Sequence, residues 1–91
     1  MLIHKPEVED RKKSLADPDI TVRSAALRDY SYLGVLDDIP DLVKIAKDDS
    51  SLAIQHNAAM AISDILSRHR LQNKLSHMKK KRMVQRLQKI N

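Results

Sequence analysis

The chain has 91 residues and no cysteine, so it forms one small domain without disulfides or thiolate metal sites. One glycine, no Phe and no Trp, beside many Ala, Leu, Lys and Arg residues, favour helices over sheets. No apolar run reaches the length of a membrane span, and the N-terminal residues lack an apolar signal region. We therefore expect a soluble intracellular protein, cytoplasmic or nuclear, that does not associate with membranes.

The net charge of +5 is divided unevenly along the chain. Residues 65–91 contain nine Lys or Arg and no acidic residue, which gives this segment a charge of +9. Residues 1–64 contain the other eight basic residues (17 − 9 = 8) and all twelve acids, a charge of −4 (8 − 12 = −4). Such asymmetry between two parts of a chain is typical of an interaction tail.

Two helices are predicted in the first third of the chain. The first begins near Pro6, which suits a first helical turn, and ends at the turn Asp17-Pro18-Asp19. The second runs from Asp19 or Ile20 to Leu33, because its apolar residues recur every three or four positions: Val22, Ala26, Tyr30 and Leu33. Gly34, the only glycine, stands at the predicted C-terminal cap of this helix.

Two further helices follow. Asp37 and Asp38 precede the third, in which Pro40 fits the first turn and the apolar stripe is Ile39, Leu42, Val43 and Ala46. The loop 48–51 precedes the fourth, whose apolar side is Ile54, Ala58, Ala61, Ile62 and Ile65. We expect the fourth helix to end near residues 68–70.

The apolar pattern continues beyond the fourth helix and then shifts. One stripe consists of Leu71, Leu75 and Met78, and a second, well round the helix, consists of Met83, Leu87 and Ile90. The shift coincides with the basic run 79–82. Either the helix breaks there, or one long helix packs its two halves on different surfaces.

An internal repeat of 32 residues relates segments 17–33 and 49–65. The matched pairs are Asp17/Asp49, Val22/Ile54, Ala26/Ala58, Tyr30/Ile62 and Leu33/Ile65. The third helix extends the match with Ile39/Leu71, Val43/Leu75 and Ala46/Met78. A period of this size, with two helices per unit, is typical of a helical solenoid. The alternative is a bundle of four or five helices in which the register is a coincidence.

The run 17–26, Asp-Pro-Asp-Ile-Thr-Val-Arg-Ser-Ala-Ala, resembles the start of the second helix in HEAT repeats of the short, bilin-lyase-like kind. The second copy keeps Asp49, Ile54 and Ala58 but has Ser50 for the proline and Gln55 for the arginine. In this family, Asp and Arg residues of successive units commonly form a ladder of ion pairs. The resemblance implies such a pair for Arg23, with Asp17 or Asp49, whereas Gln55 removes one rung.

The repeat and the resemblance together predict an all-α fold, a short α-solenoid of HEAT-like helical hairpins with about two and a half repeats and five to six helices. Residues 1–78 form this domain in the prediction, and residues 79–91 form a basic C-terminal helix or tail.

Catalytic and cofactor chemistry have little support in the sequence. The acidic pairs 37–38 and 48–49 precede helices, where capping explains them. The four histidines are dispersed, none is followed by Glu, and a single glycine cannot build a phosphate-binding loop. We expect no enzyme activity, no metal and no cofactor.

The basic C-terminal segment is the main functional signal. Its predicted contact residues are Lys79, Lys80, Lys81, Arg82, Arg86 and Lys89. These residues are suited to docking on an acidic or grooved protein, to contact with nucleic-acid phosphates, or to nuclear import. The remaining alternative is a solvated chain end that only aids solubility. The segment has no aromatic residue, which argues against base stacking.

A second surface follows from the resemblance, because the second helices of HEAT units line a concave face. The residues predicted there are Arg23, Arg28, Gln55, His56 and Asn57. We therefore expect a protein-binding scaffold or adaptor that is a small subunit of a larger assembly. The alternative is a nucleic-acid-binding module that uses the basic segment, and self-association is a further option for so short a stack.

Overall fold

A computed structural model describes the backbone of residues 5–90 and the side chains of residues 10–86. Within this range the chain is all-helical, which confirms the predicted all-α class. The elements are α1 (Lys5–Ser14), α2 (Ile20–Leu33), the 3₁₀ turn η1 (Leu36–Asp38), α3 (Ile39–Asp48) and α4 (Leu52–Ile90). The described residues thus form four α-helices where five to six were expected.

Local signals set the starts and ends of α2 and α3. The Asp19 side chain caps α2 by accepting a 2.8 Å hydrogen bond from the Thr21 amide. At the other end, the Gly34 amide donates to the Tyr30 carbonyl at 2.8 Å. α3 begins directly after Asp38 and has proline in its first turn, since Pro40 needs no helical donor there. The predicted bounds of α2 and the predicted start of α3 are confirmed.

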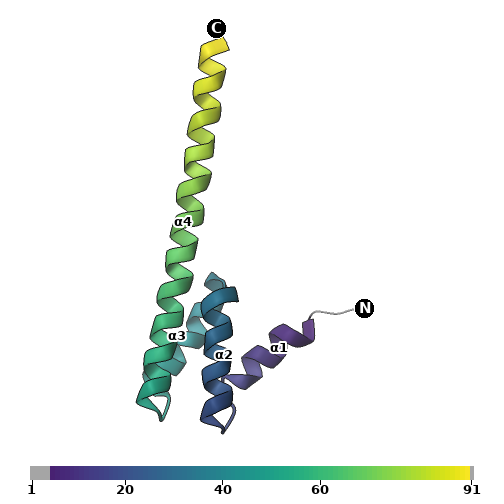
Figure 1. Ribbon diagram of the computed structural model, residues 1–91, viewed down its shortest axis with the longest axis vertical. Helices are drawn as coiled ribbons and strands as arrows, with labels where there is room; N and C mark the ends of the chain where they lie inside the picture. The colour runs from purple at the N-terminus through teal and green to yellow at the C-terminus, as the bar shows by residue number, and fades with distance from the viewer. Residues whose placement is uncertain (1–4, 91) are drawn as a thin grey trace.

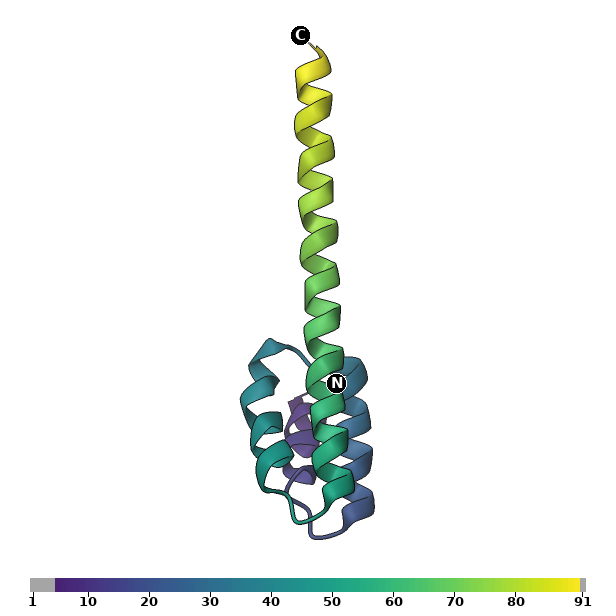
Figure 2. The same ribbon diagram turned by 90° about the vertical axis from the view of Figure 1, so that its left-hand side faces the viewer.

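The first half of α4 lies between α2 and α3, and α1 packs against α2 (Figures 1 and 2). These helices enclose one core, formed by Leu15, Ala26, Leu27, Tyr30, Leu42, Ile54, Ala58, Ala61 and Ile65. Ala58 and Ala61 are both 0% exposed. Their small side chains let the neighbouring helices approach α4 closely.

Gly34 is needed because of a close approach. Its φ of −66° is open to any residue, so no left-handed conformation is involved. A Cβ atom at this position would lie 2.6 Å from Ile65 Cδ1 and 2.6 Å from the Tyr30 carbonyl oxygen. The glycine therefore lets the end of α2 rest directly on α4.

The two loops that are 32 residues apart make equivalent hydrogen bonds. The Asp19 amide donates to Asp17 Oδ1 at 2.8 Å, and the Ser51 amide donates to Asp49 Oδ1 at 2.9 Å. Each aspartate thus closes the turn that precedes a long helix. The repeat seen in the sequence corresponds to a repeated loop structure at Asp17 and Asp49.

The repeat does not extend to the end of α2. Leu33 is 61% exposed, whereas its counterpart Ile65 is 2% exposed. The predicted match between the third helix and residues 71–78 also fails, because the matched residues differ in burial. Ile39 and Ala46 pack against the core, whereas their counterparts Leu71 and Met78 are 57% and 43% exposed.

The expectation that the fourth helix ends near residues 68–70 is wrong. α4 is 39 residues long and runs to Ile90. All glycine and proline residues of the chain lie before Asp41, so nothing between Leu52 and Ile90 breaks a helix. Under the 32-residue shift, the position of Gly34 is taken by Leu66. The loop that ends α2 therefore has no counterpart in α4.

The second half of α4 projects far beyond the other helices (Figures 1 and 2). Every residue from Arg70 to Arg86 is exposed, and the helix passes residues 79–82 without a break. Neither a break nor packing on a second surface is found in this described segment. The Cα radius of gyration is 18.2 Å, against about 12 Å for a compact chain of this length. The molecule consists of a small helical body and one projecting helix.

Candidate interaction site

We define the projecting helix as residues 70–86 of α4. Its cations are Arg70, Lys74, Lys79, Lys80, Lys81, Arg82 and Arg86, all of them exposed. Five of the six predicted contact residues of the basic segment lie in this set. The sixth, Lys89, lies outside the residues whose side chains the structure describes. The predicted cationic residues are therefore presented to solvent on a regular helix.

An apolar face runs along the projecting helix. It is formed by Leu71, Leu75 and Met78, which are 57%, 51% and 43% exposed. Spacings of four and three residues place these side chains in one row. The body does not cover this row, so three large apolar side chains stand in water. Exposed apolar patches rimmed by polar residues are typical of interaction surfaces, so this row is a candidate site.

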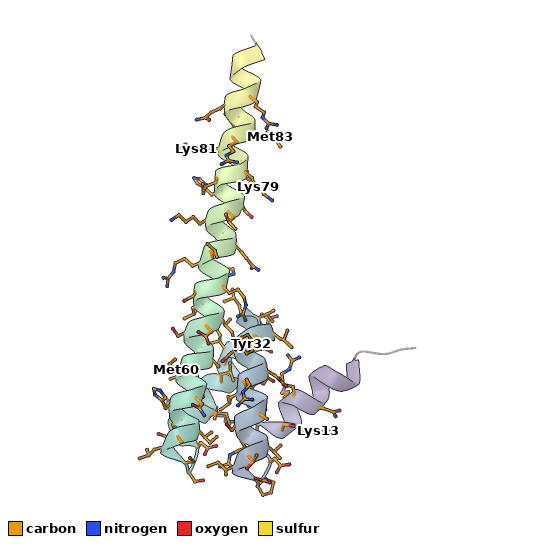
Figure 3. The ribbon with its side chains drawn as sticks, in the orientation of Figure 1. Lys13, Tyr32, Met60, Lys79, Lys81 and Met83 are labelled. Carbon is orange, nitrogen blue, oxygen red and sulfur yellow. The ribbon has the colours of Figure 1, made fainter. Side chains whose placement is uncertain are left out.

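Cations border this apolar face on both sides. At about 100° per residue, one edge holds Arg70, Lys74 and Lys81, and the other edge holds Lys79 and Arg86. Arg82 continues the apolar row itself, and Lys80 lies on the opposite side of the helix. Figure 3 shows Lys79 and Lys81 on opposite sides of the helix. Positive charge thus borders the apolar row on both sides.

A second apolar patch lies on the opposite face. Met83 is 65% exposed and Val84 is 53% exposed. They lie about 120° and about 140° from Leu71, on its two sides, so both point away from the first face, about 100° apart from each other and with Lys80 between them. The predicted second stripe began at Met83; the side chains of its other members, Leu87 and Ile90, lie outside the described range.

The fold does not neutralise the charge of the projecting helix. Among described side chains, ion pairs join Lys12 to Asp41 at 3.7 Å and Arg23 to Asp49 at 3.0 Å, both within the body. No acidic residue follows Asp64 in the sequence. Like charges four residues apart each cost a helix about 0.2–0.5 kcal/mol. An acidic partner would relieve this repulsion.

Arg68 fixes the root of the projecting helix to the body. Its guanidinium donates from Nη1 to the Ser31 carbonyl at 2.6 Å and from Nη2 to the Gly34 carbonyl at 2.7 Å. Both carbonyls belong to the end of α2, where helical partners are lacking. Sequence reasoning counted Arg68 only as a basic residue. The signal for its role is its position three residues after Ile65, near the core face of α4.

Arg23, which was predicted to lie on a concave face, instead connects the two equivalent loops. Its Nη1 donates to the carbonyls of Asp17 at 2.9 Å and Pro18 at 3.1 Å, and its Nη2 donates to Asp49 Oδ1 at 3.2 Å. Nε lies 3.0 Å from Asp49 Oδ2, within ion-pair range but without hydrogen-bond alignment. The pair implied by the family resemblance is therefore present with Asp49, while Asp17 contributes its backbone.

Gln55 makes the same backbone contact as Arg23, one repeat later. Its Nε2 donates to the Asp49 carbonyl at 2.6 Å, six residues back, as Arg23 donates to the Asp17 carbonyl. Arg23 and Gln55 are thus occupied with the loops and only partly exposed. Neither is available as a free contact residue on a helix face.

The other three residues of the predicted concave face do lie together. Arg28, His56 and Asn57 line a groove between α2 and α4. The same groove includes Tyr32 and Met60, which are 75% and 51% exposed and are labelled in Figure 3. This groove is a second exposed surface, on the body.

Comparison with protein-family models, curated proteins and solved structures finds no significant match for this chain. Within the described part of the chain, no three His, Asp or Glu side chains gather as metal ligands would. None of the described helices is long and apolar enough to cross a membrane. The function must therefore be argued from the geometry of the exposed surfaces.

Proposed function

We propose that this chain is an intracellular protein-binding scaffold or adaptor, a small subunit of a larger assembly, and that it binds through its projecting helix. The observation that supports this most strongly is the exposed row of Leu71, Leu75 and Met78 between two rows of cations. The body contributes nothing to cover this row. Amphipathic helices with such anchors commonly bind in a groove of another protein.

The energetics favour a protein partner. Burying one Leu or Met side chain fully contributes about 1.5–3 kcal/mol, so the exposed part of three such side chains supplies a useful share of a binding energy. The flanking cations would steer an acidic partner and fix the position of the helix in the groove. The row therefore supplies affinity, and the charges supply rate and specificity.

The body, in this proposal, is a short HEAT-like stack of two helical hairpins, α1/α2 and α3/α4. The support is the pair of equivalent loops at Asp17 and Asp49, joined by Arg23. Where a longer solenoid would add another hairpin, this chain extends α4. The stack thereby serves as a compact base for the projecting helix.

A nucleic-acid-binding module is the second candidate. Seven cations and no acid within residues 70–86 favour contact with phosphates. The apolar row argues against it, since Leu71 and Leu75 occupy the centre of the face that the cations border. A phosphate backbone gains nothing from alkyl groups in that position.

One set of variants separates the two candidates. Truncation after Arg70 removes the projecting helix, and the triple change Leu71→Ser, Leu75→Ser and Met78→Ser removes the apolar row but keeps every cation. We expect proteins captured from cell extract by the intact chain to be lost with both variants. In parallel, salt titrations against duplex and single-stranded nucleic acid should show only weak binding.

The proposal fails under a different pattern of results. Tight nucleic-acid binding at low salt that weakens steeply with added salt, and that survives the triple serine change, would establish the second candidate. Protein capture that persists after the truncation would move the function to the groove between α2 and α4.

A further inference from the structure

The two apolar faces of the projecting helix specify the shape of its partner. The first face is the row Leu71, Leu75 and Met78. The second consists of Met83 and Val84, which both point away from the first face but about 100° apart from each other, with Lys80 between them. The distance from Leu71 to Val84 along the axis is about 20 Å, at 1.5 Å per residue. All five side chains are exposed, between 43% and 65%. A single open groove would cover one face and leave the other in water.

The charges between the two faces specify the chemistry of the partner. Five of the seven cations lie along the two edges that separate the apolar faces, with Arg70, Lys74 and Lys81 on one edge and Lys79 and Arg86 on the other. Arg82 continues the first row, and Lys80 lies between Met83 and Val84. A protein that closes over both faces brings its rims to these edges. Carboxylates on the rims would therefore meet cations on both sides of the helix.

A second copy of this chain does not meet these requirements. Its projecting helix has no acidic residue, because none follows Asp64. Two such helices side by side would place cations against cations along both edges, which opposes association. Pairing of two projecting helices therefore cannot supply the negative charge that these cations require.

We propose that the partner is an acidic protein with two apolar lobes that closes around residues 70–86. Ca²⁺-loaded EF-hand pairs have this chemistry, since Ca²⁺ opens each pair to expose a groove rich in methionine in an acidic protein. Flexible methionines adapt to Leu, Met and Val anchors without an aromatic residue. This inference rests on the proposed function and names the class of partner.

The second apolar face decides between this partner and a one-sided groove. If one lobe holds Leu71, Leu75 and Met78, the other lobe must hold Met83 and Val84, on the opposite side and about one to two turns further along. Loss of an anchor in either face should then weaken binding. A one-sided groove would be indifferent to Val84.

The test uses the full chain with calmodulin as the probe, titrated by calorimetry in Ca²⁺ and again in EGTA. We expect a 1:1 complex of submicromolar affinity in Ca²⁺ and loss of binding in EGTA. Leu71→Glu and Val84→Glu should each weaken the affinity at least tenfold. Leu52→Glu, at a position that is 79% exposed at the far end of α4, is the matched control and should leave the affinity unchanged.

Three outcomes would overturn the inference: no Ca²⁺-dependent binding, binding that Val84→Glu leaves unchanged, or binding to phosphatidylserine vesicles in place of calmodulin. Thermal unfolding of each variant, followed by circular dichroism, checks that the body stays folded. Should calmodulin fail while protein capture still requires the apolar row, only the class of partner is wrong. Should truncation after Arg70 leave protein capture intact, the proposed function itself is wrong.

Discussion

The body and the projecting helix share α4 but differ in what their apolar residues contact. Up to Ile65, apolar residues of α4 pack against α2 and α3, and Ile54 and Ile65 are 1% and 2% exposed. From Leu71 onward, the same helix presents Leu and Met side chains to solvent. An amphipathic pattern shows which residues share a face, and only the tertiary structure shows whether that face is covered.

The two regions also differ in charge. The body contains all the acidic residues of the chain, and the projecting helix contains none. The body pairs some of its charges, as in Arg23–Asp49, whereas no ion pair among the described side chains involves a cation of the projecting helix. Changes in the body should alter stability, and changes in the projecting helix should alter binding.

The sharpest test of this division is a matched pair of leucine substitutions. Leu27 is 1% exposed, so Leu27→Ala leaves a cavity and should lower the free energy of unfolding by about 3 kcal/mol. Leu75 is 51% exposed, so Leu75→Ala should change the free energy of unfolding by less than about 0.5 kcal/mol. Urea denaturation measures both. Similar losses for the two variants would mean that Leu75 is buried against other residues and that the projecting helix is packed.

The Arg23 contacts to the two loops should have the next largest effect on the free energy of unfolding. Arg23→Ala removes the cation from Asp49, whose side chain is only 6% exposed, and should cost about 2 kcal/mol of unfolding free energy. Arg23→Gln should lose roughly half as much unfolding free energy, because Gln55, at the equivalent position of the second loop, reaches the loop carbonyl. Equal losses for the two variants in urea denaturation would show that the backbone contact adds nothing.

A Cβ at position 34 should cost somewhat less. Gly34→Ala places a methyl group 2.6 Å from a backbone carbonyl oxygen of Tyr30 and 2.6 Å from Ile65 Cδ1, which forces the end of α2 to shift. We expect a loss of about 1.5 kcal/mol in thermal or urea unfolding. Adding Ile65→Val should not restore stability, because the clash with the carbonyl oxygen remains. Restoration would show that the side-chain clash alone matters.

The smallest effect concerns alkaline pH. Burial raises the pKa of Tyr30, the negative charge of Asp38 raises it further, and Arg11 above the ring opposes these effects. Because the folded pKa lies above the unfolded one, this contribution to stability is intact below about pH 10 and is lost as pH rises through the folded pKa. The Tyr30→Phe variant has no phenol hydroxyl to ionise at this position. The wild type should therefore lose stability relative to Tyr30→Phe above pH 10, and parallel pH curves would contradict the assignment.

The sequence predicted the elements whose ends are marked by distinctive residues. Asp19 and Gly34 delimit α2, and Asp38 with Pro40 marks the start of α3. The end of α4 could not be predicted in the same way. The basic run 79–82 and the shift in apolar phase suggested a break, yet Lys, Arg, Leu and Gln are all good helix formers and no breaker is present.

The candidate site was predicted in part. The cations of residues 79–86 were found from charge alone, and the pairing of Arg23 with Asp49 was implied by the family resemblance. The role of Arg68 was missed, because its position near the core face indicates that it can reach the body but not which carbonyls it meets. The exposure of Leu71, Leu75 and Met78 was missed for a related reason: periodicity does not reveal what covers a face.

Amide hydrogen exchange of the full chain, without any partner, tests the central claim most directly. We expect strong protection for residues 54–65, which open only when the body unfolds. Residues 70–86 should exchange orders of magnitude faster, because a helix of this length without tertiary contacts is marginal in water. Equal protection of the two segments would contradict the account, since it would mean that the projecting helix is already part of a packed structure.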